Sequence, residues 1–220
     1  MFQGCCPAEA RRYVRSMGAQ TTDVLWELPA LVLAIGYVSG AIPFGLLLTR
    51  LAGAGDLRAV GSGNIGATNV LRTGRKGLAL ATLLLDALKG AAAVWIGAAL
   101  VPGGALLGGA AAFVGHCYPV WLKFRGGKGV ATFGGIALGV HWPLGVVYLA
   151  VWIGALLATR YSSVGGLAAA VAAPVAAFLI GPAQAGILFV ALAIIVVWKH
   201  RDNIARLRAG TEPRIGRKSG

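Results

Sequence analysis

The sequence predicts an all-helical polytopic membrane protein that crosses the bilayer about seven times, with some helices short or re-entrant. Apolar residues make up 57% of the 220 residues and charged residues only 12%, whereas soluble domains carry about 25% charged residues. The apolar residues form runs, most of which approach the roughly 20 residues that a helix needs to cross the hydrocarbon core. Most of the 20 lysines and arginines lie between these runs, as in cytoplasmic loops.

The first 27 residues are predicted to be a poorly ordered N-terminal extension. They contain three arginines and three acidic residues, and no apolar segment directly follows these charges as it would in a signal peptide. Met17 is an alternative start of translation. Cys5, Cys6 and Cys117 are the three cysteines, and their spacing predicts neither a disulfide framework nor a metal site.

Six apolar runs follow the extension. They cover residues 29–51, 77–100, 104–122, 130–159, 164–180 and 183–198. The fourth run is interrupted by His-Trp-Pro at residues 141–143. It can therefore cross the membrane twice as two short helices, or enter and leave on one side as a re-entrant hairpin.

Positive charge fixes the predicted orientation. The tail from Lys199 carries seven lysines and arginines and the loop 58–76 carries four, so both are predicted to be cytoplasmic. A single crossing by residues 130–159 would place the tail outside. Seven spans with an external N-terminus is therefore the main prediction, and five spans plus a hairpin is the alternative. The transmembrane catalytic domain is assigned to residues 28–200 and the cytoplasmic tail to 201–220.

The first polar segment covers residues 61–72, GSGNIGATNVLR. Glycines allow backbone N–H groups to approach an anion, and Arg72 can hold a phosphate with two hydrogen bonds. The alternative is an ordinary polar loop with a capped helix start.

The second segment covers residues 123–130, KFRGGKGV. It is not a Walker loop, because Lys128 is followed by Gly129 instead of Ser or Thr. A positively charged membrane anchor would need the cations but not three glycines around Lys128. The glycines therefore favour an anion site.

The third segment begins at His200 with the sequence HRDNIARL. On a helix, His200, Asn203 and Arg206 fall near one face. Within the second apolar run, Asp86 and Lys89 lie three residues apart. Charged residues are costly in lipid unless they pair or face inward, so these two are predicted to form a structural ion pair.

Several other functions are disfavoured. The predicted cytoplasmic loops contain only Asp56, Asp202 and Glu212 as carboxylates, so no acidic cluster suits Mg²⁺ and no metal is predicted. There is no Gly-x-Ser-x-Gly elbow and no His-x4-Asp pair of thioester-dependent acyltransferases. The basic residues do not concentrate on a soluble module, which argues against nucleic acid.

The three segments, in this order and spacing, resemble the signature motifs of the bacterial acyl-phosphate-dependent glycerol-3-phosphate acyltransferases. The resemblance covers about residues 30–216. It implies a seven-helix protein of the bacterial inner membrane with a cytoplasmic active site. The implied reaction transfers an acyl group from acyl phosphate to the 1-hydroxyl of sn-glycerol 3-phosphate, giving lysophosphatidic acid and phosphate. No cofactor or metal is implied, but a functional link to an enzyme that produces acyl phosphate is.

The resemblance also implies roles for individual residues. His200 would contact the reacting centre and act as general base, although proton removal by the substrate phosphate is an equal alternative. Glu212 would hold the tail by pairing with an arginine. The predicted catalytic residues are Ser62, His200 and Asn203; the predicted substrate-binding residues are Asn64, Thr68, Asn69, Arg72, Lys123, Gly126, Gly127, Lys128, Gly129 and Ser163; the predicted structural residues are Asp86, Lys89 and Glu212.

The chemistry is compatible with this composition. Acyl phosphate is already activated, so a protein mainly has to position two anionic substrates and stabilise developing charge. The alternative function is a transporter or flippase for an anionic small molecule. A transporter is expected to carry polar residues along a path through the membrane midplane, whereas here they gather on one predicted face.

Overall fold

The computed structural model describes residues 26–216, and every regular element in this part of the chain is a helix. A first helix covers residues 26–40 and is broken at 41–43 before α2. The α-helices that follow are α2 (Phe44–Leu51), α3 (Ala67–Leu71), α4 (Lys76–Leu100), α5 (Gly104–Cys117), α6 (Val130–Val140), α7 (Trp142–Thr159), α8 (Ser162–Ile180), α9 (Ala183–Lys199) and α10 (Arg201–Arg208). The predicted extension lies outside the described residues, apart from Trp26 and Glu27 in the first helix, and so does Met17.

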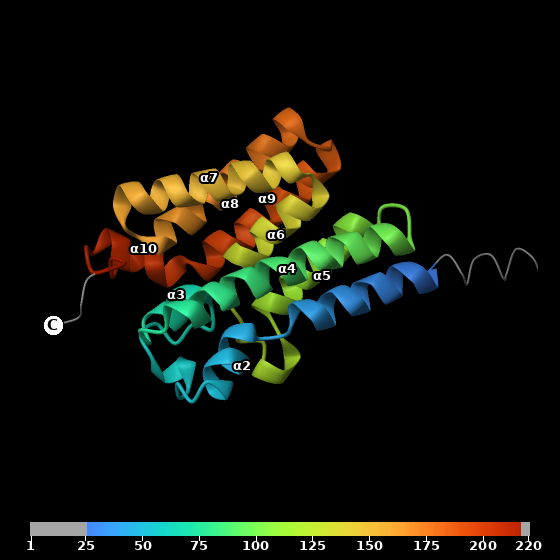
Figure 1. Ribbon diagram of the computed structural model, residues 1–220. Coiled ribbons are helices and arrows are strands. Elements are labelled where there is room, and N and C mark those ends of the chain that lie inside the picture. Colours follow the sequence, from blue (N-terminus) through green and yellow to red (C-terminus); the bar gives the residue numbers. More distant parts are fainter. Residues whose placement is uncertain (1–25, 217–220) are drawn as a thin grey trace, which may run out of the picture.

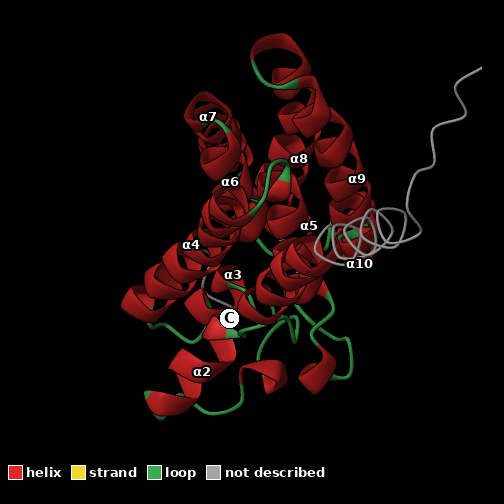
Figure 2. Ribbon diagram, turned by 90° about the vertical axis from the view of Figure 1, so that its right-hand side faces the viewer, coloured by secondary structure: helices red, strands yellow, loops and turns green. Residues whose placement is uncertain are grey.

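The long helices lie side by side and run back and forth between two ends of the molecule (Figure 1). Short turns join them at one end. The longer polar segments gather at the other end, together with α2, α3 and α10, and Figure 2 shows most of the loops there. We call this end the polar end.

Five helical segments are long and apolar enough to cross a membrane, and the bent pair α9–α10 would make a sixth. The multi-pass helical prediction is thus confirmed in its coarse form. The fourth apolar run forms two helices, α6 and α7, which meet at His141. With 11 residues, α6 is about 16 Å long, much shorter than a hydrocarbon core of about 30 Å. The count of seven spans and the sidedness of the termini remain predictions.

Close helix packing in the centre depends on small residues. A Cβ atom added to Gly90 of α4 would lie 2.4 Å from the carbonyl oxygen of Thr132, and one added to Gly135 of α6 would lie 1.8 Å from that of Ala87. Contacts this short allow only glycine. Such small residues let helix backbones approach one another in lipid, where apolar burial gives little driving force.

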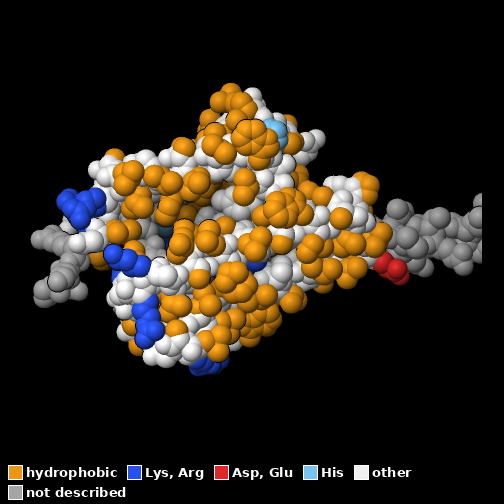
Figure 3. All heavy atoms as spheres, in the orientation of Figure 1, with side chains coloured by type: hydrophobic (Ala, Val, Ile, Leu, Met, Phe, Trp, Pro, Cys, Tyr) orange, Lys and Arg blue, Asp and Glu red, His pale blue; other side chains and the backbone are white. Residues whose placement is uncertain are grey.

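Apolar side chains cover most of the face shown in Figure 3, and lysine and arginine side chains gather toward the polar end. This distribution fits a protein whose long sides face lipid and whose polar end faces water and headgroups.

Candidate active site

The three polar segments predicted from the sequence meet at the polar end. The hydroxyl oxygens of Thr68 in α3 and Ser162 in α8 lie 2.7 Å apart, which joins the first segment to α8. The ammonium group of Lys128 in the second segment donates a hydrogen bond to the side-chain oxygen of Asn203 in α10. Segments separated by up to about 90 residues therefore share one site.

Glu212 is the centre of this polar cluster. Its Oε1 accepts hydrogen bonds from Ser163 Oγ at 2.8 Å and Asn203 Nδ2 at 2.6 Å, and its Oε2 accepts one from Arg206 Nε at 2.8 Å. Ser163, Asn203 and Glu212 are all buried. A single carboxylate thus fixes the helix α10, the start of α8 and, through Asn203, the position of Lys128.

The electrostatics of this cluster favour a bound anion. Burial lowers the pKa of Lys128 to about 8; Glu212 raises it in part, while Arg206 and Arg72 lower it further. Burial also acts to raise the pKa of Glu212, but the hydrogen bonds from its neighbours outweigh this effect and hold the pKa below its usual value. An anionic ligand near Lys128 would stabilise the charged ammonium group and relieve its repulsion from Arg72.

The glycines of the second segment let it cross the end of α5. The N–H groups of Gly126 and Gly127 donate to the carbonyl oxygens of Cys117 and His116, at 3.2 and 3.0 Å. Gly129 has φ +82°, and a Cβ atom there would lie 2.3 Å from the Phe113 ring. Gly126 and Gly127, predicted to bind substrate, thus use their N–H groups within the protein.

The next two residues, Lys128 and Gly129, keep hydrogen-bond donors for a ligand. The N–H groups of Lys128 and Gly129 make no backbone hydrogen bonds within residues 26–216, and the first turn of α6 begins at Val130. Backbone N–H groups at a helix N-terminus favour anions. Together with the Lys128 side chain, they form a concentrated group of donors.

His200 lies at the junction of α9 and α10 and is only 3% exposed. Its Nδ1 lies 2.8 Å from the carbonyl oxygen of Val196. Because a carbonyl oxygen can only accept, this hydrogen bond requires the proton on Nδ1, which leaves Nε2 of the neutral ring as an acceptor. A Cβ atom on Gly166 would lie 3.5 Å from this Nε2. The glycine therefore lies where α8 comes close to His200.

Asn69 organises the first segment. Its Nδ2 donates to the carbonyl oxygens of Leu57 and Val60, both at 2.9 Å. Its Oδ1 accepts from the backbone N–H of Ser62 at 3.2 Å, and the Ser62 hydroxyl lies 3.5 Å away. Asn69 therefore positions the exposed Ser62. Asn64 differs from it, because its Oδ1 is buried without a hydrogen-bond partner in the described part of the chain.

The guanidinium group of Arg72 lies beside Gly61. A Cβ atom on Gly61, whose φ is +54°, would approach Arg72 Cδ to 2.7 Å. Lys123 is exposed with φ +52°. Within residues 26–216, no hydrogen bond or ion pair joins its side chain to the polar cluster.

Asp86 and Lys89 form an ion pair at 2.7 Å inside the bundle. Sequence reasoning overlooked His116, whose Nδ1 lies 3.6 Å from the same carboxylate; the only signal was a histidine near the end of an apolar run. The sequence analysis also assigned no role to Arg206, although its spacing placed it on the same helix face as His200 and Asn203. Within the described residues, no group of three or more metal-ligand side chains could hold a metal ion.

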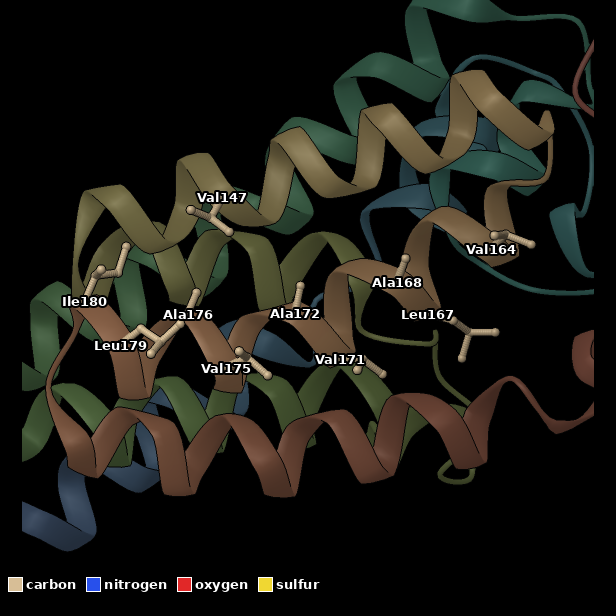
Figure 4. A pocket seen from close by; sticks show the side chains of 10 residues that line it. All are labelled: Val147, Val164, Leu167, Ala168, Val171, Ala172, Val175, Ala176, Leu179 and Ile180. Carbon is tan, nitrogen blue, oxygen red and sulfur yellow. The ribbon is translucent and has the colours of Figure 1, made fainter.

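An apolar groove of about 760 Å³ runs along α8 (Figure 4). It begins at Val164, directly after Ser163 of the cluster, and reaches Ile180 at the far end of the same helix. Its lining residues are Val147 of α7 and Val164, Leu167, Ala168, Val171, Ala172, Val175, Ala176, Leu179 and Ile180 of α8. The alanines among them keep α8 recessed, since larger side chains would fill the groove.

Comparisons with known proteins agree with these features. A family model described as glycerol-3-phosphate acyltransferase matches residues 30–210. The glycerol-3-phosphate acyltransferase of Mesorhizobium japonicum is 56% identical over 188 residues, covering 86% of this chain and 96% of that protein. The one of Methylorubrum extorquens is 53% identical over 193 residues, covering 88% and 96%.

Solved structures give the same result. The glycerol 3-phosphate form of PlsY (YgiH), an integral membrane glycerol 3-phosphate acyltransferase, has a TM-score of 0.81 and 35% identity, covering 86% of this chain and 96% of that chain. Its lysophosphatidic acid form has a TM-score of 0.79 and 33% identity, covering 86% and 95%. The chain therefore belongs to the glycerol-3-phosphate acyltransferase family.

Proposed function

We propose that this chain transfers an acyl group from acyl phosphate to the 1-hydroxyl of sn-glycerol 3-phosphate, giving lysophosphatidic acid and phosphate for phospholipid synthesis. The site would face the cytoplasm from the bacterial inner membrane. The observation that carries the proposal is the buried cluster at the polar end, in which Lys128 donates to Asn203 and Asn203 donates to Glu212, in a bundle whose α8 also lines an apolar groove. An anionic headgroup and an acyl chain would both be accommodated there.

Glycerol 3-phosphate would bind through its phosphate group. Lys128 supplies a cation with a lowered pKa, the free N–H groups at the start of α6 supply further donors, and Arg72 adds a second positive charge. The dianionic phosphate would restore the full charge of Lys128, because a nearby opposite charge raises the pKa of an amine. Binding of glycerol 3-phosphate and protonation of Lys128 are thus coupled.

The acyl chain of the donor would lie along α8. A helix rises 1.5 Å per residue, so the lining from Val164 to Ile180 extends for about 24 Å. Burying apolar chain surface provides about 25 cal/mol per Å². The groove would therefore supply binding energy at a distance from the reacting carbonyl and hold it beside the polar cluster.

The reaction needs little chemistry beyond positioning. The hydroxyl oxygen of glycerol 3-phosphate attacks the acyl carbon, the new ester bond forms, and the bond from that carbon to the phosphate oxygen breaks. Phosphate leaves with the bonding electron pair, and nearby cations stabilise its charge. The hydroxyl proton passes to His200 Nε2, which is free to accept it, or to the departing phosphate. Ser62 and Asn203 are proposed to orient the reacting oxygens.

A transporter fits these observations less well. Its polar residues would follow a path across the membrane midplane, but the Glu212 cluster and the first two segments lie at the polar end (Figures 1 and 2). Membership of the acyltransferase family also favours the enzyme. The donor would have to come from a reaction that produces acyl phosphate, which is the proposed link to a second enzyme.

The proposal is tested with the purified chain in detergent or liposomes, supplied with acyl phosphate and glycerol 3-phosphate. We expect lysophosphatidic acid and phosphate to appear in equal amounts, and no product with acyl-CoA as donor. Product with acyl-CoA alone would overturn the donor assignment. No product with either donor would overturn the enzyme assignment and revive the transporter. His200→Ala distinguishes the two proton acceptors, because near-normal turnover would exclude His200 as the base.

A further inference from the structure

A buried polar group lies behind the Lys128 segment, inside the bundle. Lys89 Nζ contacts the carboxylate of Asp86 at 2.7 Å, and the side chains of both are only 4% exposed. Lys89 also donates to the carbonyl oxygen of Ile42 at 2.8 Å, in the break that separates the first helix from α2. On the other side, Nδ1 of the buried His116 lies 3.6 Å from the Asp86 carboxylate.

Stability alone is a weak reason for keeping these charges. Removing two ions from water costs about as much as their attraction returns, so apolar residues of similar volume often stabilise a protein as well or better. Ionisable residues within membrane spans more often serve a function.

This buried group contacts the segment that carries Lys128. The carbonyl oxygen of His116 accepts a hydrogen bond from the N–H group of Gly127 at 3.0 Å. The imidazole of the same residue packs directly on Gly127, since a Cβ atom there would lie 2.1 Å from His116 Nε2. A Cβ atom on Gly126 would lie 2.1 Å from the His116 carbonyl oxygen. Both the backbone and the side chain of His116 therefore define the path of the two residues before Lys128.

We propose that His116 is a positioning residue for the Lys128 segment, with its imidazole lying between Gly127 and the buried Asp86–Lys89 pair. This inference rests on the proposed function, in which Lys128 binds the phosphate of glycerol 3-phosphate. The imidazole acts as a stop against Gly127, and Lys128 can follow only one path into the cluster of Asn203 and Glu212. His116 touches no reacting atom. Its effect is on substrate placement.

The test uses the close contact between His116 and Gly127. In the wild-type background, Gly127→Ala places a methyl group where the imidazole lies, so the segment must move. A misplacement of about 1 Å can cost on the order of 100-fold in rate, and we expect the KM for glycerol 3-phosphate to rise by about 10- to 100-fold. The φ of Gly127 is not in the left-handed region, so alanine has no backbone penalty of its own there.

The His116→Ala variant removes the stop and leaves space beside Gly127. We expect its KM for glycerol 3-phosphate to rise about tenfold, with kcat changed less than about threefold. Adding Gly127→Ala to this variant should cost less than about twofold, because the methyl group then fills vacated space. Contacting residues are expected to show such non-additive effects. His116→Gln, which keeps a polar side chain near Asp86, should recover part of the loss.

Binding of glycerol 3-phosphate, measured by the thermal shift that it produces in the purified protein, gives a readout that does not depend on acyl transfer. Val94→Ala in α4 is the control for general loss of packing, since Val94 is buried in the apolar core and is not one of the hydrogen-bonded residues of the polar cluster. It should lower the melting temperature without changing the KM for glycerol 3-phosphate.

Equal effects of Gly127→Ala with and without His116 would overturn the inference, as would a His116→Ala variant whose substrate affinity matches that of Val94→Ala. If His116→Ala does not fold, His116→Ser combined with Gly127→Ala gives the same comparison, because serine also vacates the space beside Gly127. Failure of the wild-type protein to convert acyl phosphate and glycerol 3-phosphate would instead refute the proposed function. The two failures are therefore distinguishable.

Discussion

The Glu212→Ala variant should weaken both the fold and the site, because one carboxylate accepts three hydrogen bonds. Ser163, Asn203 and Arg206 all donate to it at 2.6–2.8 Å. Its removal leaves Ser163 and Asn203 with unused donors in a buried position and leaves Arg206 without its ion-pair partner. Asn203 also loses the contact that orients its amide oxygen toward Lys128.

The size of the effect follows from these contacts. Removing one partner of a buried, hydrogen-bonded charge pair costs about 3–5 kcal/mol. Because the Arg206 side chain is 34% exposed, water can take over part of the interaction, and we expect the lower end, about 3 kcal/mol. Proteins of about this size lose about 2–4 °C in melting temperature per kcal/mol, which predicts a fall of about 6–12 °C.

The assay compares Glu212→Ala with Asp202→Ala, a carboxylate on α10 whose side chain is 72% exposed and lies 3.9 Å from Arg201. An exposed pair of this kind contributes about 0–1 kcal/mol, so the control should behave as wild type. For Glu212→Ala we expect kcat/KM for glycerol 3-phosphate to fall about tenfold or more, where tenfold corresponds to 1.36 kcal/mol. If both variants melt and turn over alike, Glu212 is not the centre of the site.

Four further outcomes follow from the geometry. Because burial lowers the pKa of Lys128 to about 8, affinity for glycerol 3-phosphate should fall as pH rises above about 8, while Lys128→Arg should keep its affinity there; a pH series of KM values measures this, and parallel profiles would contradict it. Because the folded pKa lies below the unfolded one, protein stability should rise over the interval from about 8 toward the ordinary lysine value. Ala172→Phe in the floor of the groove should shift preference toward shorter acyl phosphates in a competition assay, and an unchanged chain-length profile would place the chain elsewhere. Thr68→Val removes the 2.7 Å contact with Ser162 and should cost about 1 kcal/mol of stability, seen as a small fall in melting temperature; no change would mean that this contact is not formed in the membrane.

Periodicity and charge predicted the membrane architecture because both act locally. A run of apolar residues specifies a helix in lipid without reference to the rest of the chain. The run 130–159 shows the limit of prediction from local patterns. His141 breaks it into the 11-residue α6 and α7, but the close approach of α6 to α4 at Gly90 and Gly135 is a packing contact that no local pattern reveals.

The site was predictable by residue type and less so by role. The cations and polar side chains of the three segments do gather, as the pairing of Lys128 with Asn203 illustrates. The purpose of the glycines was not visible, however, since Gly126 and Gly127 are needed for their approach to His116, a neighbour supplied by another helix. His116 and the groove along α8 depend on helix packing. Sequence spacing alone could predict neither.

The most direct test of the account is the distance between the phosphorus of bound glycerol 3-phosphate and Lys128 Nζ. Solid-state NMR on the protein in liposomes, with ¹⁵N in its lysine side chains and Lys128→Arg to assign the signal, measures this distance. We predict a strong phosphorus–nitrogen coupling at Lys128 that corresponds to direct contact, about 3–4 Å, and none at the exposed Lys123. Coupling at Lys123 with none at Lys128 would contradict the proposed site.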